Sequence, residues 1–291
     1  MPKKVFAPGN RWLVAYLAFL SAFAPLSTDM YLPALPHMTQ ALQTTDALSS
    51  LSISCFLLLS MLFWGPLSDK YGRKPVLYTG ALLYVVSSLF LALAQSIWPL
   101  LFWRAVQAIG SGGISAMALA IVKDVLRGRA MEKVITWIQT ITILAPMLAP
   151  VIGGALLAVT DWRGIFACLL LCGLLAGAGT LLLRETMTHP VQGNAFRTLG
   201  RLLVVLRHRG FRCLLLLFSA TSMPFMAYLA LSSYIFQGLF GLSPQAYSLF
   251  FAFNAGMSML GPLAHERFFR TAPRRLFFSA YLGIVVVAGL G

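Results

Sequence analysis

Two charged side chains lie inside long apolar stretches of this sequence, and they have opposite signs. Asp29 is the one acid, of eight, that falls within such a stretch, and Arg104 is the corresponding base. A charge in the middle of a bilayer costs about 2.5–3.5 kcal/mol, and such residues usually serve function. A carboxylate that alternates between an arginine and a proton can couple proton movement to another process. We therefore predict proton coupling at Asp29 and Arg104.

Helical geometry places these two charges at matching depths. At 1.5 Å per residue, Asp29 lies about 10 Å from Pro36, where its apolar stretch ends, and Arg104 about 9 Å from Trp98, where the other begins. Opposite charges at equal depth on two helices can neutralise each other.

Each of these residues also has a purely structural interpretation. Asp29 lies shortly before Pro33 and Pro36, so its carboxylate can instead cap backbone amides where a helix breaks. The Arg104 guanidinium can instead hold backbone carbonyls of neighbouring helices. The sequence leaves these alternatives open.

A polar motif separates two apolar stretches at residues 65–74, which read GPLSDKYGRK. A truncated copy, GPLAHER, recurs at residues 261–267, so we expect two similar halves. Gly65 is expected to let its helix approach a neighbour closely, and Gly72 to adopt a positive φ where the chain reverses.

The charges of this motif suggest a gating contact. A carboxylate such as Asp69 is favoured beside an arginine or a helix N-terminus. Arg73 can reach Asp124, and such a pair can latch one conformation. Alternatively, Arg73 and Lys74 merely set the membrane topology.

A further motif, APMLAPVIGG, spans residues 145–154. Small residues recur at every fourth position, at 145, 149 and 153, which leaves one helix face nearly bare and allows close helix contact. Pro146 and Pro150 remove backbone hydrogen bonds and are expected to bend the helix. Gly153 and Gly154 complete the motif.

The composition predicts an all-α polytopic membrane protein. With 59% hydrophobic and 10% charged residues, the chain cannot cover a water-facing surface with charge. Apolar stretches long enough to cross a bilayer occupy residues 12–36, 49–68, 75–94, 98–122, 134–159, 164–183, 212–236 and 245–264. A ninth begins near Leu276 and is cut short at Gly291, so we expect about nine helices in an incomplete chain.

The distribution of positive charge predicts the topology. All 22 Lys and Arg residues except Arg104 and Arg163 lie on the N-terminal segment or on alternate loops. By the positive-inside rule, the N-terminus and these loops face the cytoplasm of a cell inner membrane. The net charge of +14 therefore reflects the membrane, and we expect no nucleic-acid partner.

The spans divide into two groups. We expect a six-helix bundle at 1–184, a cytoplasmic linker with an interfacial helix at 185–211, and part of a second bundle, helices 7 to 9, at 212–291. The cysteines and histidines are too scattered for a metal or a catalytic site, so no enzyme is expected. We assign no catalytic residue and no metal ligand.

Together, residues 27–36 (STDMYLPALP), the 65–74 motif, residues 104–110 (RAVQAIG, with Arg104, Gln107 and Gly110) and the 145–154 motif resemble the bicyclomycin/chloramphenicol-resistance (Bcr/CflA) family of the major facilitator superfamily. The resemblance implies a major facilitator fold, with two six-helix bundles in the full-length parent. It also implies proton-coupled multidrug efflux: export of amphipathic small molecules by alternating access, driven by the proton gradient without a cofactor.

The expected partners are the lipid bilayer, protons and a small-molecule substrate, and we expect a monomer. Aromatic and polar side chains are candidates for lining the substrate path. These are Tyr31, Trp137, Phe225, Tyr228, Tyr234 and Asn254. The alternatives are a narrow-specificity metabolite exporter, for example of a nucleoside or sugar, and a non-transporting fragment.

Overall fold

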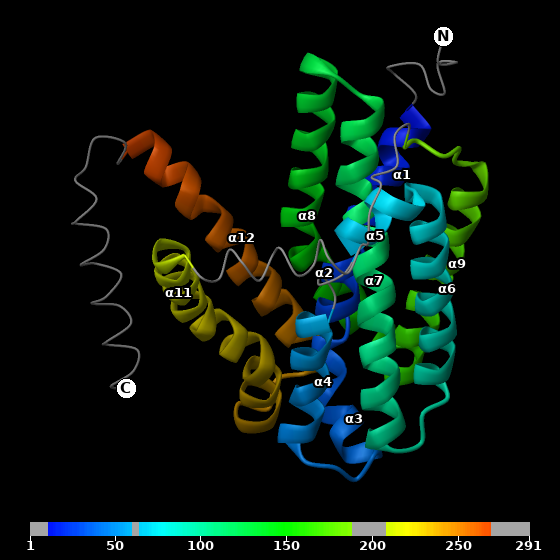
Figure 1. Ribbon diagram of the computed structural model, residues 1–291. Helices are drawn as coiled ribbons and strands as arrows, with labels where there is room; N and C mark the ends of the chain where they lie inside the picture. The colour runs from blue at the N-terminus through cyan, green and yellow to red at the C-terminus, as the bar shows by residue number, and fades with distance from the viewer. Residues whose placement is uncertain (1–10, 60–63, 188–207, 269–291) are drawn as a thin grey trace. The chain divides into compact units, whose positions relative to one another are not determined.

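The computed structural model describes residues 11–59, 64–187 and 208–268, where every regular element is helical (Figure 1). The elements are α1 (Arg11–Ser21), α2 (Phe23–Asp29), η1 (Leu32–Ala34), α3 (Leu35–Ala41), α4 (Asp46–Leu59), α5 (Trp64–Tyr71), α6 (Arg73–Ala92), α7 (Ile97–Val125), α8 (Gly128–Leu157), α9 (Trp162–Leu182), α11 (Arg209–Tyr234), η2 (Ile235–Leu239) and α12 (Pro244–Phe268). Of these, η1 is a 3₁₀-helix and η2 a π-helix.

The first predicted span is broken in two places. It bends by 41° between α1 and α2, where Pro25 has no N–H to give to the carbonyl of Ser21. The helix is interrupted again after Asp29, and η1, which contains Pro33, connects to α3. Proline therefore divides this span into short helices, and Asp29 lies at one of the divisions.

Five further predicted spans, at 75–94, 98–122, 134–159, 164–183 and 212–236, agree with described helices, whereas the stretch at 49–68 is divided between the shorter helices α4 and α5. Five described helices are long and apolar enough to cross a membrane, or six if the bent first pair is one span. α8 continues through Pro146 and Pro150 as one helix of 30 residues. The prediction of an all-α, multi-pass membrane protein is confirmed.

Close helix packing centres on α6, which contacts both α7 and α9 (Figure 1). Two glycines make the contact with α7 possible. A Cβ at Gly110 would lie 2.7 Å from the carbonyl oxygen of Gly80 and 2.7 Å from the backbone nitrogen of Tyr84. Gly110, in the 104–110 motif, therefore allows the two backbones to touch.

The chain forms two compact units, Met1–Ala252 and Phe253–Gly291. The predicted bundle boundaries at 184 and 212 stay a prediction. The interfacial helix expected within 185–211 and the ninth span expected near Leu276 fall largely or wholly outside the described residues. The GPLAHER copy lies within α12.

Substitution of Gly110 by alanine should separate α6 from α7. The new methyl group would overlap backbone atoms that cannot rotate away, so we expect a loss of about 1–3 kcal/mol in stability. Thermal unfolding of the purified protein in detergent measures this loss. Gly177→Ala is the matched control, because its Cβ would meet only the Ala81 Cβ, at 4.0 Å. Equal melting temperatures for both variants would contradict the assignment.

Candidate functional site

Asp29 is the last residue of α2, and its carboxylate is removed from the surface. Its exposed fraction is 5%. The Thr28 hydroxyl donates a hydrogen bond of 2.9 Å to Oδ1. Neither η1 nor α3 is capped by a side chain. The capping alternative is therefore not what the described residues adopt.

Arg104 lies on α7 and is fully buried. Its Nη1 donates to the backbone carbonyl of Ser27, at 3.1 Å, and to Oε1 of Gln107, at 2.7 Å. The guanidinium lies 4.7 Å from the ring centroids of both Tyr31 and Phe56, so it also makes cation–π contacts. The interpretation of Arg104 as a residue that holds a neighbouring helix carbonyl is confirmed.

Arg104 contacts the first span beside Asp29, but the two charged groups do not form an ion pair in the described residues. Arg104 binds the carbonyl two residues before Asp29 and stacks on the ring two residues after it. No ion pair between Arg104 and Asp29 occurs within the described residues. Nε and Nη2 of Arg104 are buried without a hydrogen-bond partner, so two donor nitrogens of the guanidinium are unused.

Gln107 of the 104–110 motif extends this polar cluster. Its side-chain nitrogen donates to the Ser88 hydroxyl, at 2.8 Å, which connects α7 to α6. Gln107 is fully buried. The spacing of three residues puts Arg104 and Gln107 on one helix face, so this pairing was readable from the sequence.

The 65–74 motif is mostly helical rather than a loop. Residues 64–71 form α5, and only Gly72 separates it from α6. Arg73 contacts Asp69 at 2.7 Å and Asp124 at 2.8 Å. The predicted contact between Arg73 and Asp124 is confirmed. Lys74 instead donates to the carbonyl of Leu181, at 3.3 Å.

Gly72 has the positive φ that the sequence predicts, at 102°. A second constraint was not visible in the sequence. A Cβ at Gly72 would lie 2.5 Å from the carboxylate of Glu185. Glycine is therefore required here for its conformation and for the room it leaves.

Glu185, which the sequence did not single out, caps the start of α6 from a distant part of the chain. Its carboxylate accepts hydrogen bonds from the backbone N–H groups of Arg73, at 2.9 Å, and Lys74, at 3.0 Å. Its own neighbours Thr186 and Met187 donate to it as well. Partial burial favours a raised pKa, but these four donors outweigh it and lower the pKa of Glu185.

The expectation for Gly65 is wrong. No atom lies within 4 Å of a Cβ built there, and the residue is exposed. Close approach in this region is instead made at Gly113, where a Cβ would lie 2.9 Å from the indole ring of Trp64. The small residue that this contact requires is on α7, not on α5.

The small-residue stripe of α8 is buried, as predicted. Ala145, Ala149 and Gly153 are all inaccessible. A Cβ at Gly153 would collide with the carbonyl oxygen of Met30, and one at Gly154 with the Ser248 hydroxyl. The stripe thus packs against the break in the first span.

The six candidate lining residues are in different surroundings. Tyr31 is fully buried, and its hydroxyl bonds to Ser52, at 3.1 Å. Trp137 and Phe225 are 54% and 56% exposed. Tyr228 stacks on Phe251, with ring centroids 5.6 Å apart. Tyr234 is half-buried and Asn254 is exposed. Their role in binding stays a prediction.

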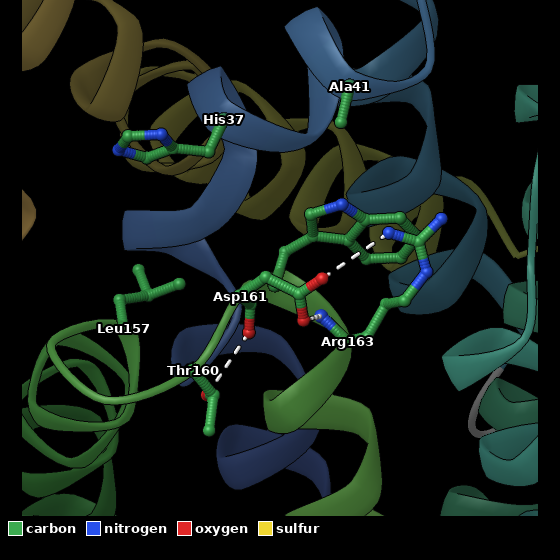
Figure 2. Close-up of a pocket in the computed structure, with 7 residues that line it drawn as sticks. His37, Ala41, Leu157, Thr160, Asp161 and Arg163 are labelled. Carbon is green, nitrogen blue, oxygen red and sulfur yellow. Dashed lines mark hydrogen bonds and ion pairs between the residues drawn. The ribbon is translucent and has the colours of Figure 1, made fainter.

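One cavity, of about 270 Å³, lies where α3, the end of α8 and the start of α9 meet (Figure 2). Asp161 in its wall caps α9 by accepting from the backbone N–H of Arg163, at 3.0 Å. The Arg163 guanidinium stacks on Trp162 and donates to the carbonyl of Ala94, at 3.0 Å. Asp161 and Arg163 thus already bond within the protein, whereas the indole N–H of Trp162 is buried without a hydrogen-bond partner. No predicted site residue lines the cavity.

Comparison with known proteins identifies the family. The sequence profile of the Major Facilitator Superfamily matches residues 17–291. The chain belongs to the major facilitator superfamily. This is a family of transporters rather than enzymes, and the chain is a multi-pass membrane protein.

Several relatives carry names that relate to drug resistance. The chain is 34% identical over 248 residues to a chloramphenicol resistance protein of Pseudomonas aeruginosa, covering 82% of this chain and 58% of that protein. It is 30% identical to the multidrug resistance protein MdtL of Klebsiella pneumoniae, covering 97% and 72%. It is also 32% identical to the MFS-type transporter YdgK of Bacillus subtilis, covering 88% and 66%. The two resistance names agree with the Bcr/CflA resemblance. The chain spans 58–72% of the length of these three relatives.

Solved structures agree on the fold. A bacterial homologue of the human lysosomal transporter Spinster superimposes with a TM-score of 0.68 and 17% identity, covering 91% of this chain and 65% of that one. The xylose transporter XylE of E. coli gives 0.66 and 14%, covering 88% and 73%. The prediction of a major facilitator fold is confirmed.

Replacement of Gly72 by alanine should destabilise the junction of α5 and α6. A side chain at φ 102° is strained by about 1–3 kcal/mol, and the methyl group would displace the Glu185 carboxylate. We expect a lower melting temperature in detergent for Gly72→Ala and an unchanged one for Gly65→Ala. A larger effect at Gly65 would contradict this account.

The lowered pKa of Glu185 predicts how its contribution depends on pH. A carboxylate whose pKa is lower in the folded protein stabilises it above the unfolded pKa, and this contribution disappears as pH falls through the folded pKa. The melting temperature of the parent should therefore exceed that of Glu185→Gln at neutral pH, and the difference should shrink below about pH 4.3. Glu132→Gln, at an exposed position on α8, is the control. A difference that does not change with pH would show that the charge is irrelevant.

Proposed function

We propose that the protein exports amphipathic small molecules, drugs among them, from the cytoplasm in exchange for protons. Membership of the superfamily and the drug-resistance names of its relatives support this class of substrate. The proton gradient is then the driving force, and no cofactor is required.

The arrangement of Asp29 and Arg104 is the observation on which the coupling proposal rests. The carboxylate is buried at a break in the first span, and the guanidinium binds the Ser27 backbone carbonyl before it and the Tyr31 ring after it. Two donor nitrogens of the guanidinium have no partner. An ionised carboxylate gains most from such donors, whereas a protonated one can do without them.

The proposed cycle follows from this difference. Protonation of Asp29 removes the negative charge, and deprotonation lets the carboxylate turn toward the unused donors of Arg104. Because Arg104 also binds the Ser27 carbonyl, a change in its hydrogen bonds can move the first span against α7. Rocking of two bundles about a central site would convert this movement into alternating access.

The proposed cellular setting is the inner membrane, with the N-terminus in the cytoplasm. The positive residues of the described regions support it. Lys70 lies in the last turn of α5 and Arg73 and Lys74 begin α6, and the ion pair of Arg73 with Asp124 puts Lys123 of α7 at the same end of the bundle. We propose a monomer that works with lipid, protons and its substrate, and without nucleic acid.

The test uses the protein expressed from its complete reading frame, in energised everted membrane vesicles. Addition of chloramphenicol-like compounds or cationic dyes should release protons from the acidic lumen, as followed with a pH-sensitive dye. Asp29→Asn should reduce this release to the level of vesicles without the protein. Asp46→Asn, at an exposed acid on α4, should behave like the parent.

Other outcomes would change the proposal. Equal release from the parent and Asp29→Asn would mean that this carboxylate is structural. No response to any drug would point to an exporter with one narrow substrate, and the same assay with nucleosides and sugars would then identify the class.

A further inference from the structure

The break in the first span leaves backbone carbonyls that helix bonds do not fully satisfy. In a continuous helix the carbonyl of Leu32 would accept from the N–H of residue 36, but that residue is Pro36, which has none. Leu32 instead accepts a shorter-range bond from the N–H of Leu35. Lone pairs on this stretch of backbone are therefore available to other donors.

Side chains at the end of α11 and in η2 supply those donors. The Ser233 hydroxyl donates to the carbonyl of Leu32, at 2.6 Å, and the Gln237 side-chain nitrogen donates to the carbonyl of Pro33, at 3.0 Å. Gln237 also bonds the Ser233 hydroxyl, at 2.8 Å, so the two side chains hold each other in position.

The backbone of this second segment is irregular at the same place. The α-helix α11 ends at Tyr234, and the π-helix η2 follows directly. π-helices are rare in proteins, and those that occur often lie at functional sites. Both partners of the contact thus depart from regular helix where they meet.

Two further hydrogen bonds join α11 to α3 and α4. The Tyr234 hydroxyl bonds the Thr39 hydroxyl on α3, at 3.0 Å, and the Ser50 hydroxyl on α4 donates to the carbonyl of Ala230, at 3.1 Å. Thr39 also donates to the Ser49 hydroxyl, at 2.8 Å. Ser49 and Ser233 are fully buried, so water does not reach their hydroxyl groups as the contact stands, whereas Tyr234 and Gln237 are partly buried.

The contact lies at the end of the helices opposite to Arg73. The chain runs along α4 and α5 from Asp46 to Tyr71, so the start of α4 and the start of α6 are at opposite ends. With Arg73 and Lys74 on the cytoplasmic side, as proposed above, the contact faces the outside of the cell.

We propose that Ser233, Tyr234 and Gln237 form a reversible latch that closes the outer side of the transport path. The inference rests on the proposed function, because the latch must release whenever the outer side opens. Its acceptors are largely carbonyls that water can bind after release, so opening has a moderate cost. Leu32 and Pro33 are within about one helical turn of Asp29, so the buried carboxylate and the latch share one irregular segment.

The experiment measures how often the outer side opens, independently of transport. A single reporter cysteine at Ser49, isosteric with serine, is placed in the complete protein after replacement of its other cysteines by alanine. Intact cells are then treated with a membrane-impermeant maleimide. The labelling rate of a buried thiol is proportional to the fraction of time that it is exposed, even when that fraction is small.

Gln237→Met keeps the length of the side chain and removes the donor. It should raise the labelling rate at the Ser49 reporter by about threefold to tenfold, which is the effect of one hydrogen bond on an equilibrium. Ser233→Ala should act in the same direction. Ser222→Ala, whose hydroxyl bonds only the carbonyl of Phe218 in its own helix, should leave the rate unchanged.

A second reporter separates opening from unfolding. Ser87→Cys lies on α6, where the native hydroxyl is fully buried and bonds its own helix. Its labelling should stay slow in Gln237→Met. An unchanged rate at the Ser49 reporter in Gln237→Met, or an equal rise at both reporters, would overturn the latch. Because no substrate is present, failure of the drug-export proposal would leave this result intact.

Discussion

The structure depends most on the burial of one permanent positive charge. Arginine does not lose its proton in proteins, so Arg104 must be stabilised where it lies. The Ser27 carbonyl, the Gln107 amide and the rings of Tyr31 and Phe56 supply that stabilisation. These contacts fix α7 to the first span, and Gln107 extends the connection to α6 through Ser88. One guanidinium therefore sets the relative position of three segments.

Proline residues divide the first span into short helices, and the contacts of the span depend on these divisions. Pro25, Pro33 and Pro36 each remove a backbone donor, which divides the span into short helices. The divisions create the place where Asp29 is buried and the carbonyls to which Ser233 and Gln237 donate. In a regular helix those carbonyls would already accept backbone hydrogen bonds, which would leave fewer lone pairs for another segment.

Glycine and charge act together at the opposite end of the bundle. Gly72 allows the chain to turn sharply from α5 into α6, and the same missing side chain leaves room for Glu185. The carboxylate then satisfies the N–H groups that open α6. Arg73 joins Asp69 to Asp124 beside it, so the motif connects three helix ends.

The sequence by itself determined the fold class, the spans and the chemistry of the main motifs. Hydropathy and helical periodicity are local properties, and they located Asp29, Arg104, Gly72 and the pairing of Arg73 with Asp124. Tertiary structure decided which atoms meet. It put Arg104 on the Ser27 carbonyl rather than on the Asp29 carboxylate, and brought Glu185 to Gly72. It left open space where a Cβ at Gly65 would lie, and it matched Ser233 to Leu32. Such contacts join residues far apart in the chain, and they depend on helix rotation and on freed backbone groups, which residue types alone do not specify.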